Sequence, residues 1–139
     1  MISHVLVPMD ESELAANALR YALEAHPNAE ITVLHVVGTP SRMMGQAAKI
    51  ALAEDAEAEA RDEAEQVLDK ARGIAEEFDR PISTEIEFGH PTRNILNCAD
   101  EFDLVVVGSH GGSLADRLFV GNVAEAVFRR SPTPVTVVR

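Results

Sequence analysis

The alternation of β-rich and helical runs is the feature that most constrains how this chain of 139 residues can fold. Five short apolar runs have the composition of β-strands and cover residues 1–8, 30–37, 82–88, 104–107 and 134–138. Four segments between them repeat apolar side chains at helical spacing and cover residues 10–25, 54–78, 91–101 and 122–130. This order predicts parallel strands, because each helix returns the chain to the end of the sheet where the next parallel strand begins.

The fold class that follows is a single α/β domain over residues 1–139. We expect one five-stranded parallel sheet, doubly wound, with helices on both faces. Right-handed crossovers leave few strand orders, and we expect the order 3-2-1-4-5, with the first strand at the centre. Residues 82–88 alternate apolar side chains with Ser83, Glu85 and Glu87, which is typical of an edge strand with one wet face. Residues 39–53 have an ambiguous pattern.

The net charge of the chain disfavours some classes of binding partner. A formal net charge of −11 argues against nucleic acid and against anionic membrane surfaces as partners, since their phosphates would meet an acidic surface. Lysines number only two, Lys49 and Lys70, and the other basic residues are arginines. Scarce lysine with abundant Asp, Glu and Ala favours a protein of a salty cytoplasm, and a strongly charged helix in an ordinary organism is the alternative.

The sequence predicts a cytoplasmic protein without a membrane partner. It has no apolar run as long as a membrane helix needs, and no signal pattern stands at its amino terminus. Cys98 is the only cysteine, so no internal disulfide can form. We interpret Cys98 as a small buried thiol and not as a reactive one.

The expected topology places a ligand site beyond the carboxyl ends of the strands, where the direction of winding reverses. In the order 3-2-1-4-5 this point lies between the first and fourth strands. Pro8, Met9 and Asp10 leave the first strand, and a glycine-rich stretch beginning at Gly108 leaves the fourth. The sequence has neither a glycine followed by lysine nor a G-x-G-x-x-G after its first strand, so a Walker-type loop and a Rossmann dehydrogenase are disfavoured.

The glycines of that stretch indicate a cradle for phosphates. Gly108, Gly111 and Gly121 let the backbone turn tightly and approach a ligand with its N–H groups. Asn122 and Val123 open the last helix, whose amino end carries partial positive charge. A surface loop with Asn122 as an ordinary helix cap remains the alternative interpretation.

These residues resemble the phosphate-binding motif of the ATP-binding branch of the universal stress protein family. The spacing is Gly108-x-x-Gly111, nine residues, then Gly121. The likeness spans essentially the whole chain, through residues 5–10, 34–37, 89–91 and 134–138. The family motif normally continues with Ser or Thr where this chain has Asn122, and Ala124 replaces another frequent hydroxyl.

The resemblance implies an ATP-binding regulatory protein of the stress response, usually dimeric, with Mg²⁺ or another divalent cation at the phosphates. The residues that it places around the nucleotide are Pro8, Met9, Asp10, Val36, Val107, Gly108, His110, Gly111, Gly121, Asn122 and Val123. Two alternatives stay open: a dimeric scaffold of the same family with an empty site, and a slow ATPase. No residue is predicted to be catalytic, and the histidines lack the spacing of a metal site.

Some residues have two interpretations. Asp10 either contacts the ligand or, with Glu13 three positions later, forms a capping box. His35 lies inside a strand and is interpreted as a structural histidine. His110 and Arg117 either contact phosphate or belong to a solvated loop.

The strand Pro134–Val138 is expected at an edge of the sheet with little to block further pairing. This exposed edge predicts a homodimer formed through the strand.

Overall fold

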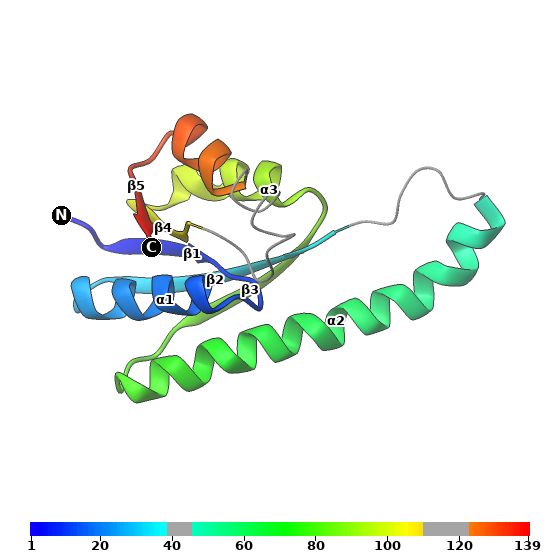
Figure 1. Cartoon of the computed structure of the whole chain (residues 1–139), viewed down its shortest axis with the longest axis horizontal. Coiled ribbons are helices and arrows are strands. Elements are labelled where there is room, and N and C mark those ends of the chain that lie inside the picture. The colour runs from blue at the N-terminus through cyan, green and yellow to red at the C-terminus, as the bar shows by residue number, and fades with distance from the viewer. Residues whose placement is uncertain (39–45, 110–122) are drawn as a thin grey trace.

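A computed structural model describes residues 1–38, 46–109 and 123–139 and contains one five-stranded parallel sheet (Figure 1). The strands are β1 (His4–Pro8), β2 (Glu30–Val37), β3 (Ser83–Phe88), β4 (Leu104–Gly108) and β5 (Val135–Val138). Their order is β3-β2-β1-β4-β5 and every pairing is parallel, so the predicted topology is confirmed.

Helices cover both faces of the sheet, as Figure 1 shows. The first face carries α1 (Glu13–Ala25) and α2 (Gln46–Glu77). The second carries α3 (Pro91–Cys98), the short 3-10 helix η1 (Ala99–Glu101) and a helix over residues 123–130. Each face has its own apolar core. Because alternate side chains of a strand point to opposite faces, Val5 and Val7 enter the first core while Leu6 enters the second, and all three are fully buried.

Two helix starts differ from the sequence prediction. The first helix begins at Glu13 instead of residue 10, because Ser12 is its N-cap and the Ser12 Oγ accepts a hydrogen bond from the Ala15 N–H at 3.1 Å. The helix α2 begins at Gln46 instead of residue 54. An alanine-rich run over 46–53 favours helix through its high intrinsic helix propensity. The spacing of apolar residues does not reveal this preference.

Long-range polar contacts join the connection after α2 to the end of α1. The guanidinium of Arg80 donates to the carbonyl oxygens of Leu23 and His26 at the end of α1 and to that of Ala29 in the loop that follows. No basic residue stands in the last turn of α1, so Arg80 supplies the positive charge that this helix end favours.

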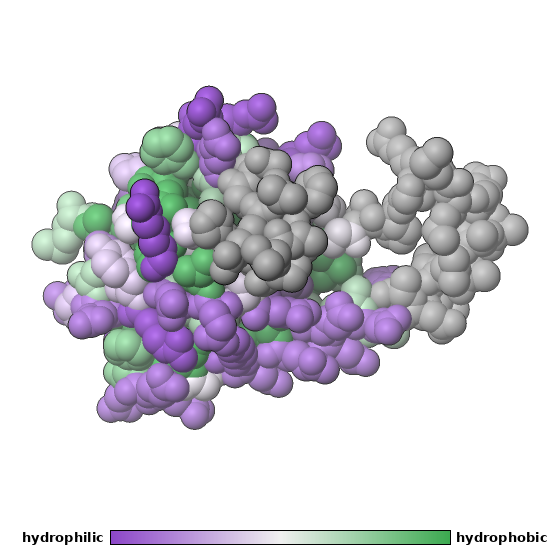
Figure 2. Space-filling model, in the orientation of Figure 1, coloured by the Kyte–Doolittle hydropathy of each residue, from purple (hydrophilic) through white to green (hydrophobic). Residues whose placement is uncertain are grey.

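The outer surface of the first face is hydrophilic. Figure 2 shows polar and charged side chains gathered over α2, where Glu57, Glu59, Asp62 and Glu63 are exposed. Within the three described ranges, no helix is both long enough and apolar enough to cross a membrane.

Candidate functional site

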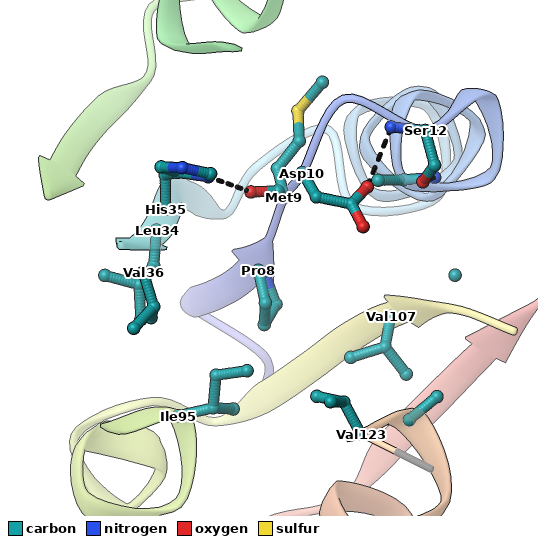
Figure 3. Close-up of a pocket in the computed structure, with 13 residues that line it drawn as sticks. Pro8, Met9, Asp10, Ser12, Leu34, His35, Val36, Ile95, Val107 and Val123 are labelled. Carbon is teal, nitrogen blue, oxygen red and sulfur yellow. Dashed lines mark hydrogen bonds between the residues drawn. The ribbon is translucent and has the colours of Figure 1, made fainter. Parts of the chain in front are cut away.

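A pocket lies where β1 and β4 separate at their carboxyl ends. The two strands pair only at Val5 with Leu104 and Leu6 with Val105, and they diverge beyond these rungs. The space between them amounts to about 590 Å³ when the part open to solvent is included. The residues that line it, most of them labelled in Figure 3, are Pro8, Met9, Asp10, Ser12, Ala15, Leu34, His35, Val36, Ile95, Val107, Gly108, Val123 and Ala124.

The structure brings part of the predicted site together. Seven of the predicted residues line this one pocket, namely Pro8, Met9, Asp10, Val36, Val107, Gly108 and Val123. The other four, His110, Gly111, Gly121 and Asn122, lie outside the described residues, as does Arg117. Contact of any of these residues with a ligand therefore stays a prediction.

Asp10 does not form the capping box. The N-cap of α1 is Ser12, and the Asp10 Oδ1 accepts a hydrogen bond from the Ser12 N–H at 2.8 Å. Glu13 instead accepts from the Lys70 Nζ at 3.1 Å, on the surface between α1 and α2. This turn leaves the second carboxylate oxygen of Asp10 pointing toward the open middle of the pocket (Figure 3). Asp10 can accept a further hydrogen bond there.

Apolar side chains form the walls of the pocket. Leu34, Ile95 and Val107 are each exposed by 5% or less, and they face the partly buried Val123 across the pocket. Leu34 and Ile95 were missing from the sequence prediction. The signal for Leu34 was available, because it stands two residues before Val36 and so shares its face of the strand. These walls suit a flat apolar group such as an aromatic base.

Gly108 is required by packing between β4 and α1. A Cβ on Gly108 would lie 2.8 Å from the carbonyl carbon and oxygen of Leu14 and 3.0 Å from the nitrogen of Ala15. These are backbone atoms in the first turn of α1. The sequence argument gave this glycine a role in approach to a ligand, whereas the structure shows that the fold itself needs it.

The end of β1 is held by two hydrogen bonds at Met9. The Met9 N–H donates to the Leu34 carbonyl at 2.8 Å, which extends the β1–β2 ladder by one rung. The Met9 carbonyl lies 2.9 Å from the Nδ1 of His35 (Figure 3). A carbonyl only accepts, so Nδ1 carries the proton. His35 is hydrogen-bonded, as expected of a structural histidine, and it also lines the pocket, which the sequence did not indicate.

Outside the pocket, the described residues contain no evident reactive centre. Cys98 is only partly buried, and its thiol donates to the Ile95 carbonyl. Burial and, to a smaller extent, the charges of Glu87, Glu85 and Glu101 raise the pKa of Cys98 to about 11, so this thiol stays protonated and poorly nucleophilic at neutral pH. Within the described ranges, no three His, Cys, Asp or Glu side chains are placed to hold a metal ion.

The fold is an open parallel α/β sheet with a pocket at the reversal of its winding, which is the place where sheets of this kind bind ligands. The sequence profile of the universal stress protein family matches residues 1–139. The universal stress protein YxiE of Bacillus subtilis is 32% identical over 148 residues, an alignment that covers 100% of both chains. The chain therefore belongs to the universal stress protein family.

Solved structures agree with this assignment. The universal stress protein UspA from Lactobacillus plantarum is similar with a TM-score of 0.82 at 29% identity, and the match covers 99% of this chain and 98% of that chain. A universal stress protein in complex with cAMP is similar with a TM-score of 0.72 at 27% identity, with 99% and 97% covered.

Proposed function

We propose that this protein binds an adenine nucleotide, ATP with Mg²⁺, in the pocket between β1 and β4 and acts as a regulatory module of the stress response. The observation that carries the proposal is the backbone of Val36. Backbone groups of successive strand residues point to alternate sides: the Leu34 carbonyl faces β1, where it accepts from Met9, and the Val37 carbonyl faces β3, where it accepts from Gly89. The N–H and C=O of Val36 therefore point toward the β1 side.

Beyond Met9, β1 no longer covers that side of β2. The next rung of a parallel ladder would join the Val36 N–H to the Met9 carbonyl, and no such bond is present among the described residues. One donor and one acceptor thus stand side by side next to apolar walls. The Watson–Crick edge of adenine offers the complement, an exocyclic amine that donates and a ring nitrogen that accepts. Guanine and hypoxanthine reverse this pair.

The remaining groups support the same ligand. In this proposal the second oxygen of Asp10 accepts a hydrogen bond from a ribose hydroxyl. From there the phosphates would extend toward Gly108 and the predicted cradle of Gly111, Gly121 and Asn122. Asp10 is the one carboxylate among the pocket residues, and a carboxylate together with nucleotide phosphates is a usual environment for Mg²⁺. The relative solved with cAMP holds an adenine nucleotide.

Calorimetry on nucleotide-free protein tests this proposal. ATP with Mg²⁺ at ~100 times its dissociation constant should stabilise the fold by about 2.7 kcal/mol. Asp10→Asn should weaken binding by about 3- to 10-fold, because a hydrogen bond to a charged carboxylate is replaced by a weaker one to a neutral amide oxygen. Glu11→Gln is the matched control, since it removes the same charge from an exposed neighbour outside the pocket. Absence of any heat or stabilisation at millimolar ATP would reject nucleotide binding and favour the scaffold alternative.

We also propose a homodimer formed through β5. Among the described strands β5 pairs only with β4, so its other edge is open. The side chains of Val137 and Phe128, which lies on the helix over 123–130, are exposed by 41% and 60%. Antiparallel pairing of two β5 strands would extend the sheet across the dimer and bury this apolar surface.

In this proposal the protein signals through whether the pocket holds a nucleotide, and not through rapid hydrolysis of it. Slow ATP hydrolysis is the alternative function.

A further inference from the structure

We infer that His35 is a positioning residue that sets the base preference of the pocket. This inference rests on the proposed function and deepens it. The side chain of His35 takes the place of a backbone donor at the Met9 carbonyl, and so decides which backbone groups of β2 remain available to a ligand.

The first step concerns the ladder between β1 and β2. Its regular rungs run from His4 with Glu30 to Pro8 with Leu34, and the bond from the Met9 N–H to the Leu34 carbonyl follows. In a regular continuation the Met9 carbonyl would accept from the Val36 N–H. Instead, the acceptor is engaged by the His35 Nδ1 at 2.9 Å. A side-chain donor has replaced the next backbone donor.

The second step concerns the direction in which the chain leaves β1. Because the Met9 carbonyl is bonded to His35, no hydrogen bond to the Val36 N–H holds the Met9–Asp10 peptide against β2. The chain therefore diverges from β2 at this point. The divergence leaves Pro8 on one side of the pocket and Val36 on the other (Figure 3). Without the imidazole donor, the nearest backbone replacement for the Met9 carbonyl is the Val36 N–H, because a carbonyl left unpaired at this partly buried position costs free energy.

The consequence is a specific effect on base recognition. If Met9 captures the Val36 N–H, the pocket loses the donor that meets the ring acceptor of adenine and keeps only the Val36 carbonyl. A pocket with the acceptor alone no longer separates adenine from hypoxanthine well. A purely structural histidine would lower stability and leave the ratio of the two affinities unchanged.

The test compares ATP with inosine triphosphate, which differs at the base edge alone. His35→Leu removes the donor and should reduce the ratio of the two affinities by about 5- to 10-fold, the effect of one neutral hydrogen bond. His35→Asn should retain the wild-type ratio, since its amide nitrogen stands close to where Nδ1 lies. His26→Leu is the control, because His26 is a partly buried histidine at the opposite end of α1.

Each outcome is decisive. A wild-type ratio in His35→Leu overturns the inference whatever its stability, and His35→Phe repeats the test with a ring that lacks a donor if the leucine variant does not fold. Nitrogen-15 shifts of the wild-type imidazole give an independent check, since a neutral ring protonated at Nε2 cannot donate to Met9 and would also overturn it. If the wild type binds ATP, failure of these tests leaves the proposed function standing. If it binds neither nucleotide, the proposed function itself fails.

Discussion

Gly108→Ala should destabilise the protein even when no nucleotide is present. The new Cβ would lie 2.8 Å from two backbone atoms of Leu14, well short of the 3.4 Å at which ordinary contact begins. Among the described glycines only Gly89 has a left-handed backbone, with φ of 137°, so alanine at position 108 meets no conformational barrier. The penalty therefore comes from the steric clash with α1.

The size of the penalty follows from what must move. Overpacking of this kind costs about 1–3 kcal/mol. The displaced turn also contains the Ala15 N–H that bonds the Ser12 cap, and loss of a cap costs about 0.5–2 kcal/mol. We expect Gly108→Ala to lower the free energy of unfolding by about 2–4 kcal/mol, because relaxation lets the two effects overlap.

Urea unfolding at fixed KCl, without nucleotide, measures this effect. Gly73→Ala is the matched control. Gly73 is exposed in α2 and a Cβ there would have no atom within 4 Å, so the same chemical change should stabilise by about 0.5–1 kcal/mol. A Gly108→Ala variant within about 0.5 kcal/mol of the wild type at equal m-value would refute the packing argument. If the two variants change stability in opposite directions, lost packing alone is enough to explain any loss of ATP binding in Gly108 variants.

Four further predictions follow from other parts of the molecule. Arg80→Met keeps the apolar stem but removes three hydrogen bonds to the end of α1 and the loop after it, and chemical denaturation should show a loss of about 1–3 kcal/mol. Hydrogen bonds from the backbone N–H groups of Ser3 and His4 lower the pKa of Asp103. The wild type should therefore be more stable than Asp103→Asn at pH values above the ordinary pKa of an aspartate. This difference in the free energy of unfolding should disappear as the pH falls through the lowered pKa of Asp103, and unfolding midpoints at several pH values measure it. Val137→Glu should abolish the proposed dimer, because it places a charge at an exposed position of the open edge strand. Light scattering that gives 15.0 kDa for the wild type would contradict the dimer. Because molar salt shortens screening to roughly 3 Å, urea midpoints should rise with KCl, and flat midpoints would remove the argument for a salty cytoplasm.

The sheet could be predicted from the sequence because buried parallel strands have a distinctive pattern. The bounds of β2 agree with the predicted residues 30–37, where Gly38 and Pro40 end an uninterrupted β-rich run. Strand order followed from the alternation with helices and the handedness of crossovers. The helix starts at Glu13 and Gln46 were harder, since a cap two residues past Asp10 and an alanine-rich run leave the apolar periodicity unchanged.

The pocket was only partly accessible to sequence reasoning. Residues that directly follow strands, such as Pro8, Asp10 and Gly108, could be placed at the switch point from topology alone. Ser12 and Ile95 reach the pocket through the packing of α1 and α3 against the sheet, which no local pattern specifies. The hydrogen bond from His35 to Met9 joins residues 26 positions apart, and its existence depends on the register of β1 against β2.

Gly108 and His35 illustrate one principle about how this pocket arises. Both act on the spacing of backbone segments: the missing side chain of Gly108 lets α1 approach β4, and the imidazole of His35 lets β1 depart from β2. The first contact holds the amino end of α1 at the pocket, where Asp10 bonds Ser12. The second leaves the backbone of Val36 open to a ligand. Substitutions at these positions should therefore change the shape of the pocket before they change its chemistry. A change of base preference in His35 variants, set against a general loss of stability in Gly108 variants, would separate recognition from support.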